Sequence, residues 1–521
     1  MLALVEGSKN LRRLCREYET ESVTVHLKEL VGGAFSLYAA ATIRRTGGVH
    51  VFVAEDRDAA AYLLNDLYAL LDERRILFFP SSYKRSIVYG AEDAQGVVQR
   101  TAALNALRTP PAGYLALCTY PEALAERVVD AEALRRETMT VRAGDRLRPA
   151  DLVEWLDESG FVRVDFVYEP GQYSQRGGIV DVFSYVESLP YRFDFFDEEV
   201  DSIRRFNISS QLSSDRLERV EIIPDLNAGT PAAAKVSFAR FAGAEASWWF
   251  YDADFVLRRV NDIRRRTLSD MEHPDEIDSL LTSRNSLVAD LSGSRIFLLR
   301  DNLPERPAAA TVKFATSPQP KFNKNFEMLA DDMIRGALRG YDTYILSENK
   351  AQVERLENIF HQIGRGQAVV RSLSTTLHEG FVDNDLKLCL YTDHQIFDRY
   401  QRYRINGEIR RDEQMTVAEL NQLRPGDYVV HIDHGVGRFD GLVKIAAGDG
   451  RMQEAIKLVY KDGDVLFVNV HSLHRISRYK SGDGEPPKVY KLGNGAWQKL
   501  KNATKKAVKD ISRELIALYA K

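Results

Sequence analysis

The strongest constraint on the fold lies in residues 423–479, where short β-rich runs alternate with turn residues. The expected strands are residues 428–432, 438–445, 456–460 and 465–470. Asp462-Gly463, between the last two runs, is a strong local signal for a hairpin. The glycines of His434-Gly435-Val436-Gly437 predict a turn with positive φ. About five short strands in so small a segment favour a small closed β-barrel.

Upstream of this segment the pattern changes to strands that alternate with helices. Strands are expected at residues 49–54, 76–79, 114–118, 248–251 and 296–299, and helices at residues 57–71 and 92–107. Continuous apolar strands between helices are typical of a parallel α/β sheet. Within this domain, strands are expected at residues 161–168, 178–183, 191–196 and 200–206. Their Gly-, Pro- and acid-rich turns indicate an antiparallel insert.

Two further segments complete the organisation of the chain. Residues 306–410 predict a small, separate α/β unit, with helices at 325–339 and 349–363 and strands at 343–347 and 386–392. From Trp497 to Tyr519, apolar residues recur at helical spacing with lysines between them. We expect this helix to be a connector that binds DNA only weakly, because a solvated lysine face is the commoner arrangement.

Composition limits the classes of function. The 521 residues are 28% charged with a net charge of −4, which argues against a surface that grips nucleic acid throughout. The three cysteines form no CxxC pair, so we expect neither a zinc site nor a disulfide framework, and a reducing cytoplasm fits. His431, His434, His471 and His474 lack the partners of a metal motif. No run of apolar residues is long enough to predict a membrane span.

The segment 31–37, Val-Gly-Gly-Ala-Phe-Ser-Leu, lies where the first strand meets the first helix. Its domain resembles the nucleotide-binding domain of the excision-repair helicase UvrB, whose G-x-x-x-x-G-K-[ST] loop holds ATP and Mg²⁺. Gly32, Gly33 and Ser36 remain in the corresponding place, but the lysine does not. We therefore expect a degenerate phosphate loop that forms a tight turn, with no catalytic residue, no metal and no ATP hydrolysis.

The antiparallel insert contains the string 168–183, YEPGQYSQRGGIVDVF, followed by PYRFDFFD at 190–197. This pattern resembles domain 2 of UvrB and its counterpart in the transcription-repair coupling factors, which dock on the damage-recognition ATPase UvrA. The resemblance implies UvrA contacts at Arg176, Arg192 and Phe196. The alternative is that Phe196 belongs to the core and that the arginines form solvated ion pairs. UvrB's long aromatic DNA-clamping hairpin has no equivalent here.

The string VVHIDHGVGRFDG at 429–441 resembles the RNA-polymerase-interacting domain of the transcription-repair coupling factors, which CarD-type regulators share. This resemblance implies binding to the β subunit of RNA polymerase. We expect the strand at 455–460 to add to a sheet edge of the partner, with Ile456 and Leu458 on the contact face. The alternative is that both residues are barrel core.

The order of these parts resembles the N-terminal half of the bacterial transcription-repair coupling factor. The expected parts are a degenerate UvrB-like α/β domain (1–120 and 216–305), a UvrA-binding α+β insert (121–215), a small α/β domain (306–410), a Tudor/SH3-like β-barrel (418–482) and a linker helix (490–521). In that family a following motor, absent here, uses ATP and Mg²⁺ and carries most DNA binding. We expect a cytoplasmic monomer that recruits partners. The rivals are an active UvrB-like helicase, an inactive UvrB-like paralogue and a CarD-like regulator.

Overall fold

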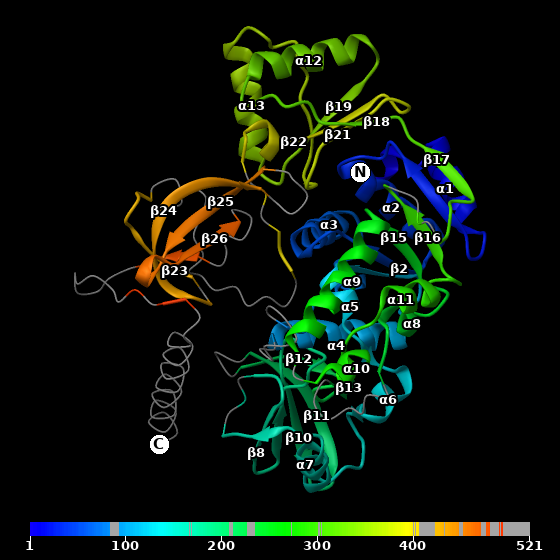
Figure 1. Cartoon of the computed structure of the whole chain (residues 1–521), viewed down its shortest axis with the longest axis vertical. Helices are drawn as coiled ribbons and strands as arrows, with labels where there is room; N and C mark the ends of the chain where they lie inside the picture. The colour runs from blue at the N-terminus through cyan, green and yellow to red at the C-terminus, as the bar shows by residue number, and fades with distance from the viewer. Residues whose placement is uncertain are drawn as a thin grey trace. The chain divides into compact units, whose positions relative to one another are not determined.

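The computed structural model describes residues 1–83, 93–165, 167, 169–207, 212–226, 235–271, 273–300, 303, 305–399, 401, 403–405, 423–431, 433–446, 452–469, 476–479, 489 and 491–492. The chain divides into two compact units, Met1–Glu408 and Ile409–Lys521 (Figure 1). The predicted connector helix, from Trp497 to Tyr519, lies outside the described residues, as do His471 and His474.

A seven-stranded sheet forms the centre of the first unit, in the order β17-β1-β16-β15-β2-β4-β3. Its strands are β1 (Thr24–Lys28), β2 (Gly48–Val53), β3 (Ile76–Phe78), β4 (Tyr114–Thr119), β15 (Ser247–Phe250), β16 (Arg295–Leu298) and β17 (Ala310–Lys313). All neighbouring strands are parallel, as the continuous apolar runs predicted. Strand β17 adds to this sheet, although the sequence analysis assigned residues 310–313 to the small α/β domain.

Helices cover this sheet because the strands are apolar on both faces. The longer ones are α1 (Lys9–Tyr18), α2 (Gly33–Thr46), α3 (Arg57–Leu70), α4 (Ala94–Arg108) and α9 (Ala253–Asp270); the shorter ones are α5 (Pro121–Ala125), α6 (Ala131–Arg136), α8 (Phe238–Ala242), α10 (Ile277–Leu280) and α11 (Arg284–Asp290). Strands β5 (Val128–Val129) and β14 (Lys235–Val236) form a separate antiparallel pair. Helix α2 is buried from Gly33 to Ile43, so it is the central covering helix.

The insert is a six-stranded sheet in the order β12-β11-β10-β9-β8-β7, mostly antiparallel, and α7 (Pro149–Glu158) packs on one face (Figure 1). Its strands are β7 (Val162–Arg163), β8 (Gln172–Arg176), β9 (Ile179–Val182), β10 (Tyr191–Phe196), β11 (Glu199–Phe206) and β12 (Ser213–Leu217). A separate pair, β6 (Met139–Arg142) and β13 (Arg219–Ile222), accompanies it. The antiparallel insert is thus present, with β8 and β12 in addition to the predicted strands.

The small α/β domain contains a mixed five-stranded sheet in the order β18-β21-β22-β19-β20. Its elements are β18 (Thr316–Pro318), α12 (Phe326–Leu338), β19 (Asp342–Leu346), α13 (Lys350–Gln362), β20 (Arg371–Leu373), β21 (Phe381–Asp383), β22 (Leu388–Thr392) and α14 (Asp393–Ile396). Asn325 and Asn349 cap α12 and α13, because each side chain accepts a hydrogen bond from a backbone N–H of the first turn.

The second unit contains a five-stranded antiparallel sheet in the order β26-β25-β24-β23-β27. Its strands are β23 (Tyr428–His431), β24 (Gly435–Ala446), β25 (Met452–Val459), β26 (Val465–Asn469) and β27 (Ile476–Arg478). The turn predicted at Asp462-Gly463 joins β25 to β26, with φ values of 65° and 82°. Residues 435–437 lie within β24, which begins at Gly435, and Gly435 has the predicted positive φ, at 76°. Gly437 packs closely under the Tyr460 ring, which a Cβ at that position would meet at 3.0 Å.

Candidate functional site

The two faces of the six-stranded insert sheet differ in chemistry. Val180, Val182, Tyr191 and Phe193 point to one face, where they form a core with Leu152 and other residues. Because side chains alternate along a strand, the residues between them point to the opposite face. That open face carries Ser174, Arg176, Asp181, Arg192, Asp194, Phe196, Ser202 and Arg204. Its charged groups surround the buried side chains of Ser174, Asp181 and Ser202, and Phe196 is its exposed apolar residue.

Asp181 is the centre of this open face. Its side chain is fully buried, yet it accepts hydrogen bonds from two arginines. Arg176 Nη2 lies 2.5 Å from Asp181 Oδ2, while Arg192 Nε and Nη2 lie 2.7 and 3.0 Å from Oδ1 and Oδ2. The two strands that flank β9 place these arginines on either side of the carboxylate. One buried acid therefore fixes both predicted contact arginines.

The two arginines differ in what they can offer a partner. The Arg192 side chain is 16% exposed, and its guanidinium also lies over the Phe206 ring at 4.4 Å. The hydrogen bond to Asp181 raises the pKa of Arg192 above its ordinary value. The Arg176 side chain is 35% exposed, so it has more surface to present. Both arginines do form ion pairs, as the alternative held, but their shared acid is buried and Arg176 is the more exposed of the two.

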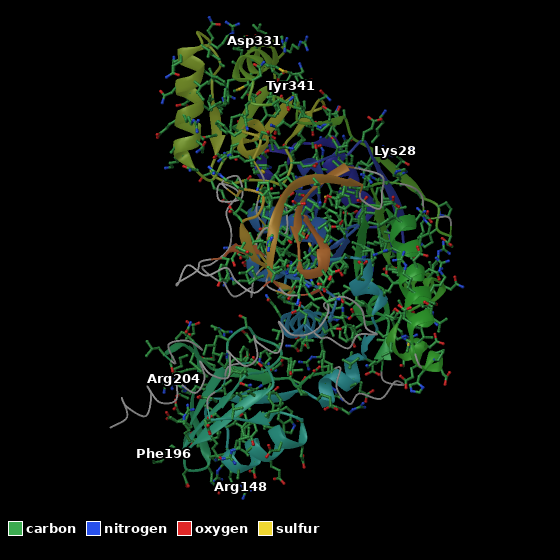
Figure 2. All side chains as sticks on the ribbon, turned by 60° about the vertical axis from the view of Figure 1, so that its left-hand side comes forward. Lys28, Arg148, Phe196, Arg204, Asp331 and Tyr341 are labelled. Carbon is green, nitrogen blue, oxygen red and sulfur yellow. The ribbon has the colours of Figure 1, made fainter. Side chains whose placement is uncertain are left out.

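Phe196 is the most conspicuous apolar group in this domain. It is 80% exposed, whereas Phe193 and Phe206 are fully buried. Figure 2 shows Phe196 at the outer edge of the domain that also carries Arg204. The alternative that Phe196 belongs to the core is therefore wrong. An exposed aromatic on the same sheet face as fixed arginines has the composition of a protein-binding hot spot.

Sequence reasoning assigned no role to four residues of this face, which are Asp181, Asp194, Ser202 and Arg204. Asp194 pairs with Arg204 and accepts a hydrogen bond from Ser202 Oγ at 2.8 Å. Asp181 was quoted only as part of a string, although it holds the arginines in place. The signal that could have found them is the alternation of charged and apolar residues along Tyr191–Phe196 and Glu199–Phe206.

The second candidate site is in the sheet at 428–478, where the structure corrects the expected strand. Ile456 and Leu458 are completely buried and belong to the core with Val429 and Phe439. Strand β25, which carries both residues, is hydrogen-bonded to β24 on one side and to β26 on the other. A strand paired on both sides cannot add to a partner sheet. The contact assigned to Ile456 and Leu458 is therefore not available on this surface, and the core alternative is correct.

Strand β26 lies at the edge of the same sheet, with β25 as its neighbour among the described strands. Val465 and Phe467 are 40% and 47% exposed, whereas Leu466 and Val468 point to the core. An edge strand presents unpaired backbone groups, and the two exposed apolar side chains lie on one face of it. This strand combines the features that strand addition requires.

The segment 31–37, which the sequence analysis compared with a phosphate loop, forms a tight turn into α2. Gly32 has φ of 55°, which a glycine adopts without strain, and the helix begins at Gly33. Ser36 is buried, and its hydroxyl donates a hydrogen bond to Asp66 Oδ2 at 2.6 Å. Phe35 packs edge-on against Tyr251, with ring centroids 4.9 Å apart. The residues at this turn are thus engaged with the protein itself.

The residues that the structure describes also bear on metal ligation, cysteine chemistry and membrane insertion. Within those residues, no three His, Cys, Asp or Glu side chains converge as metal ligands would. Cys15, Cys118 and Cys389 are free thiols, and burial raises the pKa of the Cys118 thiol well above its ordinary value. Among the described helices, none combines the length and apolar character that spanning a bilayer demands.

Comparison with known proteins gives two domain matches. Residues 139–227 match the family described as the UvrB interaction domain, and residues 423–480 match the CarD-like/TRCF RID domain. These ranges enclose the open face and the edge strand described above.

The relatives that match most of the chain are transcription-repair-coupling factors. The transcription-repair-coupling factors of Bacillus subtilis (strain 168) and Escherichia coli (strain K12) are each 25% identical, over 95% of this chain and 48% of the relative. That of Staphylococcus haemolyticus is 25% identical over 88% of this chain and 45% of the relative. The chain spans about half the length of the curated relatives it matches. It is therefore related to the N-terminal region of the transcription-repair coupling factors, with that region's UvrB interaction domain followed by its CarD-like domain.

Proposed function

We propose that this chain is the recruitment part of a transcription-coupled DNA repair factor. In this proposal the sheet at 428–478 binds the β subunit of a stalled RNA polymerase. The insert brings the UvrA component of the excision-repair machinery to the same place. The observation that carries the proposal is the presence of both matched domains in one chain. A CarD-like regulator or an inactive UvrB paralogue would account for only one of the two.

The UvrA contact is assigned to the open face of the insert. Phe196 supplies the apolar anchor and Arg176 the accessible charge, while Asp181 holds the guanidiniums in position. Aromatic and arginine side chains dominate the energetics of protein interfaces, and guanidiniums recognise carboxylates in a fixed geometry. We infer that the partner presents an acidic surface with an apolar pocket.

Titration of UvrA with the chain and its variants tests this assignment. Truncation of a hot-spot residue costs about 2 kcal/mol or more, which is roughly thirtyfold in affinity. We expect Phe196→Ala and Arg176→Ala each to weaken binding by about that factor. Leu338→Ala is the matched control, because Leu338 is an equally exposed apolar residue, at 84%, on α12. Undiminished binding by a Phe196→Ala/Arg176→Ala double variant would remove the assignment.

The polymerase contact is assigned to the edge strand β26 in place of β25. Backbone groups of β26 would continue the partner sheet, and Val465 and Phe467 would contact its side chains. We expect Phe467→Arg to leave the sheet folded, because that side chain is half exposed, and to abolish binding to the β subunit. If the folded Phe467→Arg variant bound like the parent, the assignment of β26 would be wrong.

Chemistry on ATP is not part of the proposed role of this chain. The phosphate-loop position lacks its lysine, and the Ser36 hydroxyl is bonded to Asp66. The residues present therefore do not fit a nucleoside triphosphate with its Mg²⁺. An ATPase assay on the purified chain should give no turnover above background; turnover that disappears in a Ser36→Ala variant would favour the helicase alternative instead.

A further inference from the structure

The backbone donors at the start of α2 are already used by the protein. Gly33 N donates to Glu379 O at 3.1 Å, and residue 379 belongs to the small α/β domain. Ala34 N and Phe35 N donate to Val31 O and Gly32 O within the turn. These N–H groups are the donors that a phosphate loop would direct at its ligand. They are all satisfied without one.

The space above the turn is filled as well. A Cβ atom built on Gly33 would lie 2.3 Å from Glu379 O and 2.9 Å from Leu377 Cδ1. A Cβ on Gly32 would lie 3.3 Å from Glu379 Oε2, so the carboxylate stands beside the N-terminus of α2. Negative charge is favourable at this end of a helix. Residues 377–380 thus occupy the volume, and supply the sign of charge, that a bound phosphate would.

Asp66 joins three segments beneath this contact. Its Oδ2 accepts the Ser36 hydroxyl, and its Oδ1 accepts the backbone N–H of His378 at 2.6 Å. Asp66 lies on α3 and is almost fully buried, so both hydrogen bonds are shielded from water. The serine that would bind Mg²⁺ in an active phosphate loop is therefore part of a link between α2, α3 and residue 378.

Further contacts join residues 377–383 to α2 and α3. The His378 ring stacks on the Tyr62 ring of α3 with centroids 3.7 Å apart. The Tyr38 hydroxyl of α2 donates to Asp383 Oδ2 at 2.7 Å, and this pair is buried. Leu377 is buried and belongs to the core of the seven-stranded sheet domain. The contact is therefore continuous and packed, with polar groups satisfied on both sides.

We propose that the degenerate phosphate loop is a docking site for residues 377–380 of the same chain. The small α/β domain is then the resident occupant of the former nucleotide site, and its role is to hold itself onto the UvrB-like domain through that site. Gly32 and Gly33 allow the close approach of the 377–380 backbone, because neither has a side chain that would meet it. This inference does not depend on either partner assigned above.

Hydrogen exchange of the whole chain tests the docking directly. Gly33→Ala introduces a methyl group that cannot coexist with Glu379 O at its present position. We expect the amides of residues 377–380 and of the first turn of α2 to exchange at least tenfold faster. Gly7→Ala is the matched control, because a Cβ there would meet nothing within 4 Å. Unchanged protection of residues 377–380 in a folded Gly33→Ala variant would overturn the proposal.

A second variant covers the case in which Gly33→Ala does not fold. Asp66→Ala removes both acceptor oxygens, so the hydrogen bonds from the Ser36 hydroxyl and from the His378 backbone N–H are both lost. We expect faster exchange at His378 and at the start of α2, and no change in binding of UvrA or of the polymerase β subunit. Equal protection in Asp66→Ala and the parent would contradict the docking. So would saturable binding of a fluorescent ATP analogue to the parent chain, since residues 377–380 leave it no room.

Discussion

Replacement of Asp181 by asparagine should lower the local stability of the insert sheet, and it should also weaken UvrA binding. The carboxylate is fully buried and accepts hydrogen bonds from Arg176 and Arg192 at 2.5 to 3.0 Å. Asparagine has nearly the same shape but no charge, so it leaves two guanidiniums beside each other without their shared anion.

The size of the effect follows from the exposure of the three groups. Removing one partner of a fully buried ion pair costs about 3–5 kcal/mol, and an exposed pair is worth about 0–1 kcal/mol. Because the Arg176 and Arg192 side chains are 35% and 16% exposed, we expect a value between these limits. The expected loss of about 2 kcal/mol corresponds to a roughly thirtyfold larger equilibrium constant for local opening of the sheet.

Hydrogen exchange of the β9 and β10 amides in the whole chain measures this local free energy. The control is Asp194→Asn, because Asp194 lies on the same face and pairs with Arg204, but both side chains are more exposed, at 22% and 42%. We expect that control to cost about 1 kcal/mol or less. If the two variants had equal, small effects on both exchange and UvrA affinity, Asp181 would not be the group that positions the arginines.

Three further predictions concern other parts of the chain. Ile456→Arg should unfold the sheet at 428–478, because Ile456 is completely buried, whereas Phe467→Arg should retain the parent's circular dichroism; a folded Ile456→Arg variant would contradict the core assignment. Burial, with a smaller contribution from the nearby Glu379, raises the pKa of Asp66 from 3.8 to about 7, although the hydrogen bonds from Ser36 and His378 act in the opposite direction. The folded chain therefore binds a proton between about pH 4 and 7 that the unfolded chain has lost, so this contribution to stability falls as the pH rises through that window. A plot of the local unfolding free energy of residues 377–380 against pH should show this slope in the parent and not in Asp66→Asn. Val369→Ala, on the small α/β domain, should leave UvrA and polymerase affinities unchanged, and a tenfold loss of either would place a contact outside the proposed surfaces.

Much of the architecture could be predicted from local patterns. The strand at 191–196 was predicted with its observed limits, and the Asp462-Gly463 turn followed from its residue types. The alternation along Tyr191–Phe196 even places Phe196 on the open face with Arg192, although the sequence alone left its exposure open. These features depend on short-range geometry, which the residues themselves determine.

The rest depends on which segments meet, and short-range patterns do not contain that information. Ile456 and Leu458 alternate as a contact strand would, but β26 pairs on the side that a partner would need. The neighbours of Asp181 come from β8 and β10, so its role emerges only when the sheet is assembled. Likewise, no local signal in residues 31–37 indicates that residue 379 occupies the turn, because more than 300 positions separate them.

If one chain carries both docking surfaces, it should hold UvrA and the polymerase β subunit at the same time, and a bridging experiment measures this. RNA polymerase β subunit is immobilised, the chain is added, and UvrA is then passed over the surface while its binding is recorded. We expect UvrA to be retained only when the chain is present. Phe196→Ala should weaken retention of UvrA about thirtyfold without affecting retention of the chain, and Phe467→Arg should abolish retention of both. Retention of UvrA by the Phe196→Ala/Arg176→Ala variant at the parent level, or failure of the parent chain to bind the β subunit, would contradict this expectation.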